Sequence, residues 1–386
     1  MTMILDEQSA EPGTHALLIG VGDYPWLADG SKPQAERFSH PMKMGQLSSP
    51  PLSVEALANW LTDANNGFNN PERPLRSLEL LCSAATPFTW TPPGGAAMPI
   101  DRAERATAAK AIVDWKKRAD RNPENIALLY FCGHGLAFSA SQNSLLLGDF
   151  GSNGADPMVD AIAIDSLRLG LQRHCAARYQ CLFIDACRNP PTTQFIDTFG
   201  DENAGAAVIA GGVKRTIGEK LAPVYFATGL ASVAYGQPDQ PSIFMQGLLK
   251  SFRGVASREA ADHYAVIFEA LAEGINKCVE SLAFAKVPQF CQAYEAGYPF
   301  ALHHVRGDPE VIVKVFTKDE RLLPAAILSH TRQDTNKHVE RPPQPAPWWV
   351  PLPLGKYVFK AVSAQGAALI GEASRDVAPP GGQVAL

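Results

Sequence analysis

Two short stretches of this 386-residue chain decide its fold: residues 126–135, IALLYFCGHG, and residues 179–189, YQCLFIDACRN. Each begins with a run of apolar residues and ends in small or polar ones. Continuous rather than alternating apolarity is typical of strands that are buried on both faces of a parallel sheet. Because ligands and catalytic groups in such sheets lie beyond the carboxyl ends of the strands, a functional site is expected where these two runs end.

The rest of the first 300 residues repeats this pattern of buried strands and helices. Further apolar runs occur at residues 15–21, 78–82 and 224–228. Helical patterns lie between the runs: residues 53–61 with Ser53 as N-cap, 103–119, 166–175, 243–252 and 264–282. The alternation of strands and helices predicts right-handed crossovers and an α/β domain with a mostly parallel sheet flanked by helices.

The character of the chain changes near residue 305. Residues 311–316 and 357–362 have the apolar, β-branched composition of strands. Between them, residues 341–353 (RPPQPAPWWVPLP) are dense in proline, which suits an exposed extended segment or an edge strand. We therefore expect two domains: an α/β domain at residues 1–305 and a small, sandwich-like all-β accessory domain at residues 306–386.

Composition excludes several classes of protein. The net charge is −5, so the chain lacks the basic footprint of a nucleic-acid binder. No apolar run approaches the ~18–20 residues that span a bilayer, and the N-terminal residues do not form a secretory signal. The seven cysteines include no CxxC pair, which argues against a disulfide scaffold or a zinc ribbon. A cytoplasmic protein that binds neither nucleic acid nor membrane is expected.

A histidine and a cysteine follow the two decisive strands. His134 lies between two glycines, and Cys187 lies 53 residues later, after Asp185 and Ala186. A thiol acts as a nucleophile when a nearby base removes its proton, and imidazole has the pKa for that task. The backbone N–H groups of Gly135 and Cys187 are candidates for an oxyanion hole. The pair predicts thiol nucleophilic catalysis.

These motifs resemble those of the caspase-like cysteine peptidases, the superfamily of caspases, metacaspases and paracaspases. Residues 129–135 and 183–189 match the histidine and cysteine motifs, and a histidine about 50 residues before the cysteine is a known signature of caspases. Residues 16–20, 226–228 and 242–249 also resemble segments of that fold, so the resemblance covers roughly residues 14–300.

The resemblance implies a cysteine endopeptidase with a His134–Cys187 dyad, nearer to metacaspases and bacterial caspase-like proteins than to animal caspases. It implies a protein substrate and a role in signalling, bacterial defence or cell death. Asp185 stands where relatives with an acid hold a substrate Arg or Lys before the scissile bond. A buried carboxylate there favours a cation and repels an acid.

The chain departs from the pattern of its Arg/Lys-specific relatives at Ser53, which stands where a second acid is usual. Asp23, after the first strand, and Asp239, before the helix at residues 243–252, are alternative substrate-binding acids. Both also fit ordinary solvated loop carboxylates. The preference for a basic residue is an expectation that rests mainly on Asp185.

The remaining expectations concern regulation and cofactors. Residues 190–221 form a long polar stretch after the cysteine, and Lys214 and Arg215 within it are either self-cleavage sites or charges of a surface loop. No metal-ligand spacing is present, so we expect no cofactor; some metacaspases need calcium, but no loop has regular acidic spacing. The C-terminal β domain is a candidate site for a regulatory partner. The alternative function is a caspase-fold scaffold that does not cleave, although such relatives usually lose the histidine or the cysteine.

Overall fold

The computed structural model describes residues 3–39, 42, 44–201, 204–209, 220–234, 236–282, 289–366 and 368–386. The chain forms two compact units. Unit 1 comprises Met1–Gln246 and Val287–Tyr298, and unit 2 comprises Gly247–Lys286 and Pro299–Leu386. Unit 2 therefore includes the expected accessory domain and also residues from the preceding part of the chain. The domain boundary expected at residue 305 stays a prediction.

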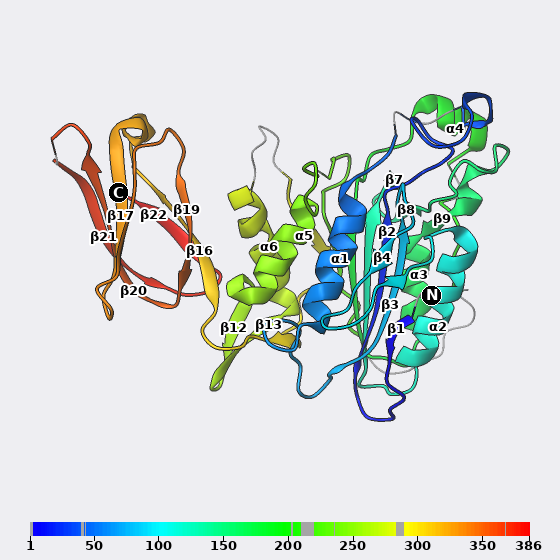
Figure 1. Ribbon diagram of the computed structural model, residues 1–386, viewed down its shortest axis with the longest axis horizontal. Coiled ribbons are helices and arrows are strands. Elements are labelled where there is room, and N and C mark those ends of the chain that lie inside the picture. Colours follow the sequence, from blue (N-terminus) through cyan, green and yellow to red (C-terminus); the bar gives the residue numbers. More distant parts are fainter. Residues whose placement is uncertain are drawn as a thin grey trace. The chain divides into compact units, whose positions relative to one another are not determined.

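A seven-stranded sheet forms the centre of unit 1, with the order β1-β3-β2-β6-β10-β11-β14 (Figure 1). The five inner strands run parallel, and the two edge strands run antiparallel to their neighbours. Their bounds are β1 Met3–Asp6, β2 Thr14–Val21, β3 Leu75–Ser83, β6 Ile126–Gly133, β10 Tyr179–Ala186, β11 Val224–Phe226 and β14 Gln292–Tyr294. The predicted mostly parallel sheet is confirmed.

Helices cover both faces of this sheet. In Figure 1, α1 (Ser49–Thr62) lies on one side, and α2 (Arg105–Ala119) and α3 (Ile164–His174) lie on the other. Gly20 of β2 lets α1 approach closely, because a Cβ there would lie 2.9 Å from a methyl carbon of Val54. On the opposite face, the Trp115 indole N–H of α2 donates to the backbone carbonyl of His15 at 2.9 Å. The sheet is thus buried on both sides, as continuous apolarity predicts.

The start of α1 differs from the expectation. Ser53 lies inside the helix and is fully buried, whereas the helix begins at Ser49 with Pro50 and Pro51 in its first turn. Proline is favoured there because the first helical N–H groups have no partner within the helix and proline fixes a helical φ. The spacing of the apolar residues predicted a helix start at Ser53, about one turn after the observed start at Ser49.

Unit 1 also contains two small β structures and a short α-helix. A three-stranded sheet follows β6 directly and carries the chain away from His134: β7 Gly135–Ser139, β8 Gln142–Leu146 and β9 Ala161–Ala163. A two-stranded hairpin joins β4 Thr89–Trp90 to β5 Met98–Pro99. Helix α4 spans Thr193–Phe199, after the cysteine motif.

Unit 2 contains helices and β-sheets. Helix α5 (Ile243–Lys250) crosses the boundary between the units, and α6 spans Phe268–Leu282. The expected helix at 264–282 is shorter, because its first residues form a strand. That strand belongs to a sheet of β12 Ser257–Ala260, β13 His263–Ile267 and β15 Ala301–His304. The tyrosine, valine and isoleucine of β13 (HYAVI) favour this extended conformation.

The C-terminal part of unit 2 is all-β, as predicted. Two sheets, of order β19-β16-β22 and β18-β17-β20-β21, share one core that includes Val313, Leu328 and Phe359. Their strands are β16 Glu310–Phe316, β17 Ala326–Arg332, β18 His338–Arg341, β19 Trp348–Pro353, β20 Gly355–Ser363, β21 Leu369–Val377 and β22 Gly382–Ala385. The proline-rich segment supplies the edge strand β19. Among the described residues, every helix of the chain is too short or too polar to cross a bilayer.

Candidate active site

The register of the sheet brings the histidine and cysteine motifs together. Strands β6 and β10 are parallel neighbours, and their last pair is Gly133 with Ala186. His134 and Cys187 are therefore the next residues on adjacent strands, at the same carboxyl edge. Both line one cavity of about 360 Å³. The two residues that the sequence singled out thus share a single site.

The imidazole of His134 has a defined proton arrangement. Its Nε2 lies 2.8 Å from the carbonyl oxygen of Gly45. A carbonyl only accepts hydrogen bonds, so Nε2 carries the proton and Nδ1 keeps a free lone pair. Burial lowers the pKa of His134, although the bond to Gly45 opposes this effect. The ring is therefore a neutral base with one nitrogen able to accept a proton.

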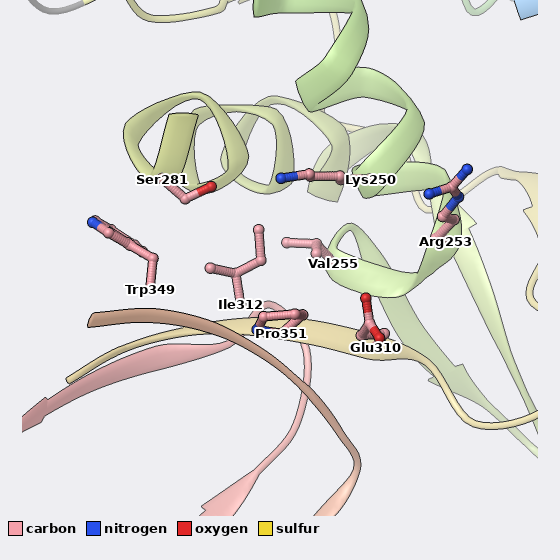
Figure 2. A pocket seen from close by; sticks show the side chains of 8 residues that line it. All are labelled: Lys250, Arg253, Val255, Ser281, Glu310, Ile312, Trp349 and Pro351. Atoms are coloured by element: carbon pink, nitrogen blue, oxygen red, sulfur yellow. The ribbon is translucent and has the colours of Figure 1, made fainter. Parts of the chain in front are cut away.

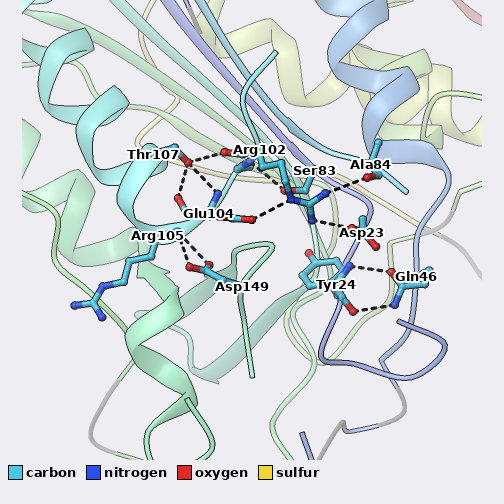
Figure 3. Close-up of polar contacts among 11 residues, drawn as sticks. Asp23, Tyr24, Gln46, Ser83, Ala84, Arg102, Glu104, Arg105, Thr107 and Asp149 are labelled. Atoms are coloured by element: carbon cyan, nitrogen blue, oxygen red, sulfur yellow. Dashed lines mark hydrogen bonds and ion pairs between the residues drawn. The ribbon is translucent and has the colours of Figure 1, made fainter. Parts of the chain in front are cut away.

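Tyr24 and Gln46 hold this histidine in place. The Tyr24 hydroxyl accepts from the His134 backbone N–H at 2.8 Å and donates to the Leu146 carbonyl at 3.2 Å. Its ring centroid lies 4.8 Å from that of the imidazole. The Gln46 side chain bonds the backbone N–H and carbonyl of Tyr24 at 2.8 and 3.0 Å (Figure 3). Because Gln46 follows Gly45 directly, one short segment fixes both the imidazole and the tyrosine behind it.

Cys187 is partly buried and its thiol is polarised by the backbone. The N–H of Ala234 donates to Sγ at 3.3 Å. Burial raises the pKa of the Cys187 thiol, and the Asp185 carboxylate raises it further, whereas the bond from Ala234 lowers it. The resting thiol therefore keeps its proton at neutral pH.

Gly135 lies very close to the cysteine loop. A Cβ at this position would come 2.7 Å from the carbonyl oxygen of Cys187 and 2.9 Å from the Cβ of Ala186. Any larger residue would push the two strand ends apart. This close approach explains the glycine. The oxyanion role expected for the N–H groups of Gly135 and Cys187 stays a prediction.

Arg188 follows the cysteine directly, and its buried side chain anchors the cysteine loop. It is 1% exposed, and its guanidinium donates to Asn143 Oδ1 at 2.9 Å and to Gln292 Oε1 at 2.7 Å. The Cζ atom of the guanidinium lies 4.3 Å from the ring centroid of Phe226. One side chain thus connects the cysteine loop to β8, β14 and β11. Arg188 belongs to the cysteine motif, but its hydrogen-bond partners could not be predicted from the sequence.

Asp185 forms part of the cavity wall and is almost fully buried. The Tyr130 hydroxyl donates to its carboxylate at 2.8 Å, and the Ser242 hydroxyl donates to the same oxygen. Burial raises the pKa of Asp185 to about 6, against the opposing effect of these hydrogen bonds. Ser53 accepts from the Ser242 N–H at 2.9 Å, so it supports the serine that contacts the carboxylate.

The other predicted acids are not part of the described cavity lining. Asp23 forms an ion pair with Arg102 at 2.7 Å (Figure 3), and Asp239 is an exposed residue in a left-handed turn conformation. Neither is among the described residues that line the cavity. Lys214 and Arg215 lie outside the described residues. Within the described ranges, no three or more His, Cys, Asp or Glu side chains gather in a position to hold a metal ion.

Comparison with known proteins agrees with these motifs. The family model of the caspase domain matches residues 14–295, which include both His134 and Cys187. The chain belongs to the caspase domain family. The predicted membership of the caspase-like superfamily is therefore confirmed.

Two individual proteins resemble this caspase-domain chain. The uncharacterized protein y4kE of Sinorhizobium fredii is 27% identical over 228 residues, which are 58% of this chain and 63% of that protein. The match thus spans less than two thirds of the relative's length. The crystal structure of caspase-1 from Spodoptera frugiperda aligns with a TM-score of 0.44 and 10% identity, over 80% of this chain and 99% of that one.

Proposed function

We propose that this caspase-domain protein is a cysteine endopeptidase with Cys187 as nucleophile and His134 as its base. The observation that carries the proposal is the strand register, which delivers the two side chains to one edge and one cavity. The hydrogen bond from His134 Nε2 to Gly45 supports it, because that bond leaves Nδ1 free to take a proton.

The proposed reaction follows from these groups. His134 Nδ1 takes the thiol proton, and Cys187 Sγ attacks the carbonyl carbon of the scissile peptide bond. The resulting oxyanion is held by backbone N–H groups, for which those of Gly135 and Cys187 are the candidates. When the C–N bond breaks, the leaving amine takes the proton from the imidazolium. Water, deprotonated by His134, then hydrolyses the thioester and releases the second product.

We further propose that cleavage follows a basic residue. Asp185 is the only carboxylate among the described residues that line the cavity, and neither lysine nor arginine is among them. A substrate Arg or Lys would find an acceptor there, whereas an acidic side chain would meet a carboxylate and no cation. A bound cation would also favour the ionised form of Asp185, whose pKa burial raises to about 6.

The test combines labelling with a peptide library. An arginyl chloromethyl ketone should label the full chain, and the library should be cut after Arg or Lys rather than after Asp or Leu. Cys187→Ala should abolish labelling, and Cys187→Ala and His134→Ala should each lower cleavage at least about 1,000-fold. Cys82→Ala is the matched control, because Cys82 is a buried cysteine that is not among the described residues lining the cavity.

Three outcomes would contradict different parts of the proposal. Cleavage that persists in Cys187→Ala would exclude the proposed nucleophile. Neither labelling nor cleavage under any activating condition would instead favour the alternative of a scaffold that binds a partner without cutting it. Cleavage after Asp would overturn only the role of Asp185.

A regulated cytoplasmic role in signalling, defence or cell death is proposed with the activity, on the family resemblance alone.

A further inference from the structure

A second cavity lies within the β-sandwich of unit 2, far along the chain from the residues of the proposed peptidase site. It occupies about 370 Å³ and is lined by residues of β17, β18, β19, β20 and the β17–β18 turn. Strands β18 and β19 are edge strands of the two sheets, so neither has a neighbour on its outer side in the described part of the sandwich. The cavity has the size of a small-molecule site.

The walls of this cavity are largely apolar. Val339, Val350, Leu352 and Tyr357 contribute side chains to them, together with two prolines of β19. Leu352 and Tyr357 are also members of the sandwich core, which holds the floor of the cavity in place. An apolar body of a ligand would bury apolar surface against these side chains.

Three basic residues and Thr335, which carries a hydroxyl, supply polar groups to the lining of the cavity. His330, Arg332 and Lys337 line it, and no carboxylate is among the described lining residues. Asp334 pairs with Arg332 at 2.9 Å but lies outside the lining, and its own side chain is 57% exposed. The charge pattern thus selects an anion and disfavours a cation.

His330 adds an unusual feature. It is 5% exposed, and its Nδ1 is buried with no hydrogen-bond partner among the described residues. The ring stacks on Trp348 with centroids 5.2 Å apart, and burial lowers its pKa. A proton on Nδ1 would be a buried donor without an acceptor. The neutral ring should therefore carry its proton on Nε2, which makes Nε2 a hydrogen-bond donor.

We propose that this cavity binds a small organic anion, namely a carboxylate carried on an apolar body. The body would occupy the space between Val350, Leu352 and Tyr357. The carboxylate would accept hydrogen bonds from Arg332 and Lys337, at the turn between β17 and β18. This binding site is independent of the proposed peptidase chemistry, and it gives the accessory domain a ligand of defined chemical class.

A different hollow of unit 2 has less suitable chemistry. It is lined by Lys250, Arg253, Glu310 and Trp349, among others, and Figure 2 shows the carboxylate of Glu310 at the same hollow as the two basic side chains. Its volume is about 160 Å³, less than half that of the sandwich cavity. Because this hollow is small and carries charges of both signs, it does not favour an anion. Its Lys250 can therefore be substituted as a control for the lysine of the sandwich cavity.

The test uses three probes with one indole body and different charges: indole-3-acetate, indole-3-acetamide and tryptamine. Binding to the full chain is measured by titration calorimetry and ligand-observed NMR. Indole-3-acetate should bind with a Kd of about 1 mM or tighter, as expected for about 13 non-hydrogen atoms at the usual efficiency. It should bind at least about tenfold tighter than the amide, and tryptamine should bind most weakly.

Charge-removing variants decide whether this binding occurs in the sandwich cavity. Arg332→Gln and Lys337→Gln should each weaken indole-3-acetate about tenfold and leave the amide unchanged, whereas Lys250→Gln should change neither. Lys337 is exposed, so its variant keeps the test valid if Arg332→Gln fails to fold. Equal affinity for the three probes, no binding of the acetate at millimolar concentration, or acetate binding that neither variant weakens would overturn the proposal.

Discussion

Asp185→Asn should change how the stability of unit 1 depends on pH. Asp185 is 3% exposed near the carboxyl end of β10, and burial raises its pKa to about 6, compared with 3.8 for the free side chain. The folded chain therefore holds the Asp185 proton more tightly than the unfolded chain does. Stability is lost as the pH rises from about 4 to about 6, because ionising the folded protein costs more than ionising the unfolded one. Asparagine has no such proton.

The size of this effect follows from the shift in pKa. One pKa unit corresponds to about 1.4 kcal/mol, so a shift of roughly two units gives about 2–3 kcal/mol between pH 4 and pH 7. That energy is a change of roughly 30- to 150-fold in the opening equilibrium. The asparagine oxygen can still accept from the Tyr130 and Ser242 hydroxyls, so the variant should fold.

Amide hydrogen exchange in β10 measures this change directly, because a central strand exchanges through the largest openings of its domain. The ratio of the wild-type rate to the Asp185→Asn rate should rise by the stated factor between pH 4 and pH 7. Taking this ratio at each pH cancels the intrinsic pH dependence of exchange. Asp239→Asn is the matched control, since Asp239 is exposed and asparagine tolerates its positive φ. A ratio for Asp185→Asn that stays constant with pH would refute the argument that burial controls this carboxyl.

Three further substitutions test the framework around the candidate nucleophile. Tyr24→Phe leaves the His134 N–H without its acceptor, so urea unfolding should show a loss of about 1–3 kcal/mol and the cysteine should be alkylated at a different rate. Gly135→Ala should lower thermal stability by about 1–3 kcal/mol because its Cβ would overlap the cysteine loop, whereas Gly154→Ala, in open space, should not. Arg188→Met leaves several buried acceptors unpaired, and should lower the free energy of unfolding by at least about 2 kcal/mol. Unchanged stability of Tyr24→Phe or Arg188→Met would contradict the importance of the hydrogen bonds that the variant removes, and unchanged stability of Gly135→Ala would contradict the steric overlap.

The central sheet could be predicted from the sequence because its strands carry their own signal. A strand buried on both faces is apolar at most positions, and β2, β6 and β10 each contain an unbroken apolar run: residues 16–21, 126–132 and 181–184. The meeting of His134 and Cys187 could then be inferred from the rule that parallel strands end at one edge. No knowledge of any loop was needed for that inference.

Loop contacts could not be predicted in this way. Tyr24 and Gln46 are 22 residues apart, and their bond depends on how an irregular segment returns to the end of β2. Nothing in the spacing of Tyr24 shows that its hydroxyl would meet a backbone N–H 110 residues later. The position of Asp23 could not be predicted for the same reason. The sequence placed Asp23 after the end of β2, but it could not show that Asp23 pairs with Arg102, which lies in the segment before α2.

The two titratable groups of the proposed dyad are shifted toward their uncharged forms. Burial lowers the pKa of His134 and raises the pKa of Cys187, so the pair at neutral pH is an imidazole and a thiol rather than an ion pair. An enzyme built on a preformed thiolate would need a cation or a helix N-terminus beside the sulfur. Here the free Nδ1 of a fixed, neutral ring is the available feature, and it suits proton transfer that accompanies attack on a bound carbonyl. In the proposed mechanism, the contacts of Gly45 and Tyr24 with His134 would keep the base in the correct orientation before the attack begins.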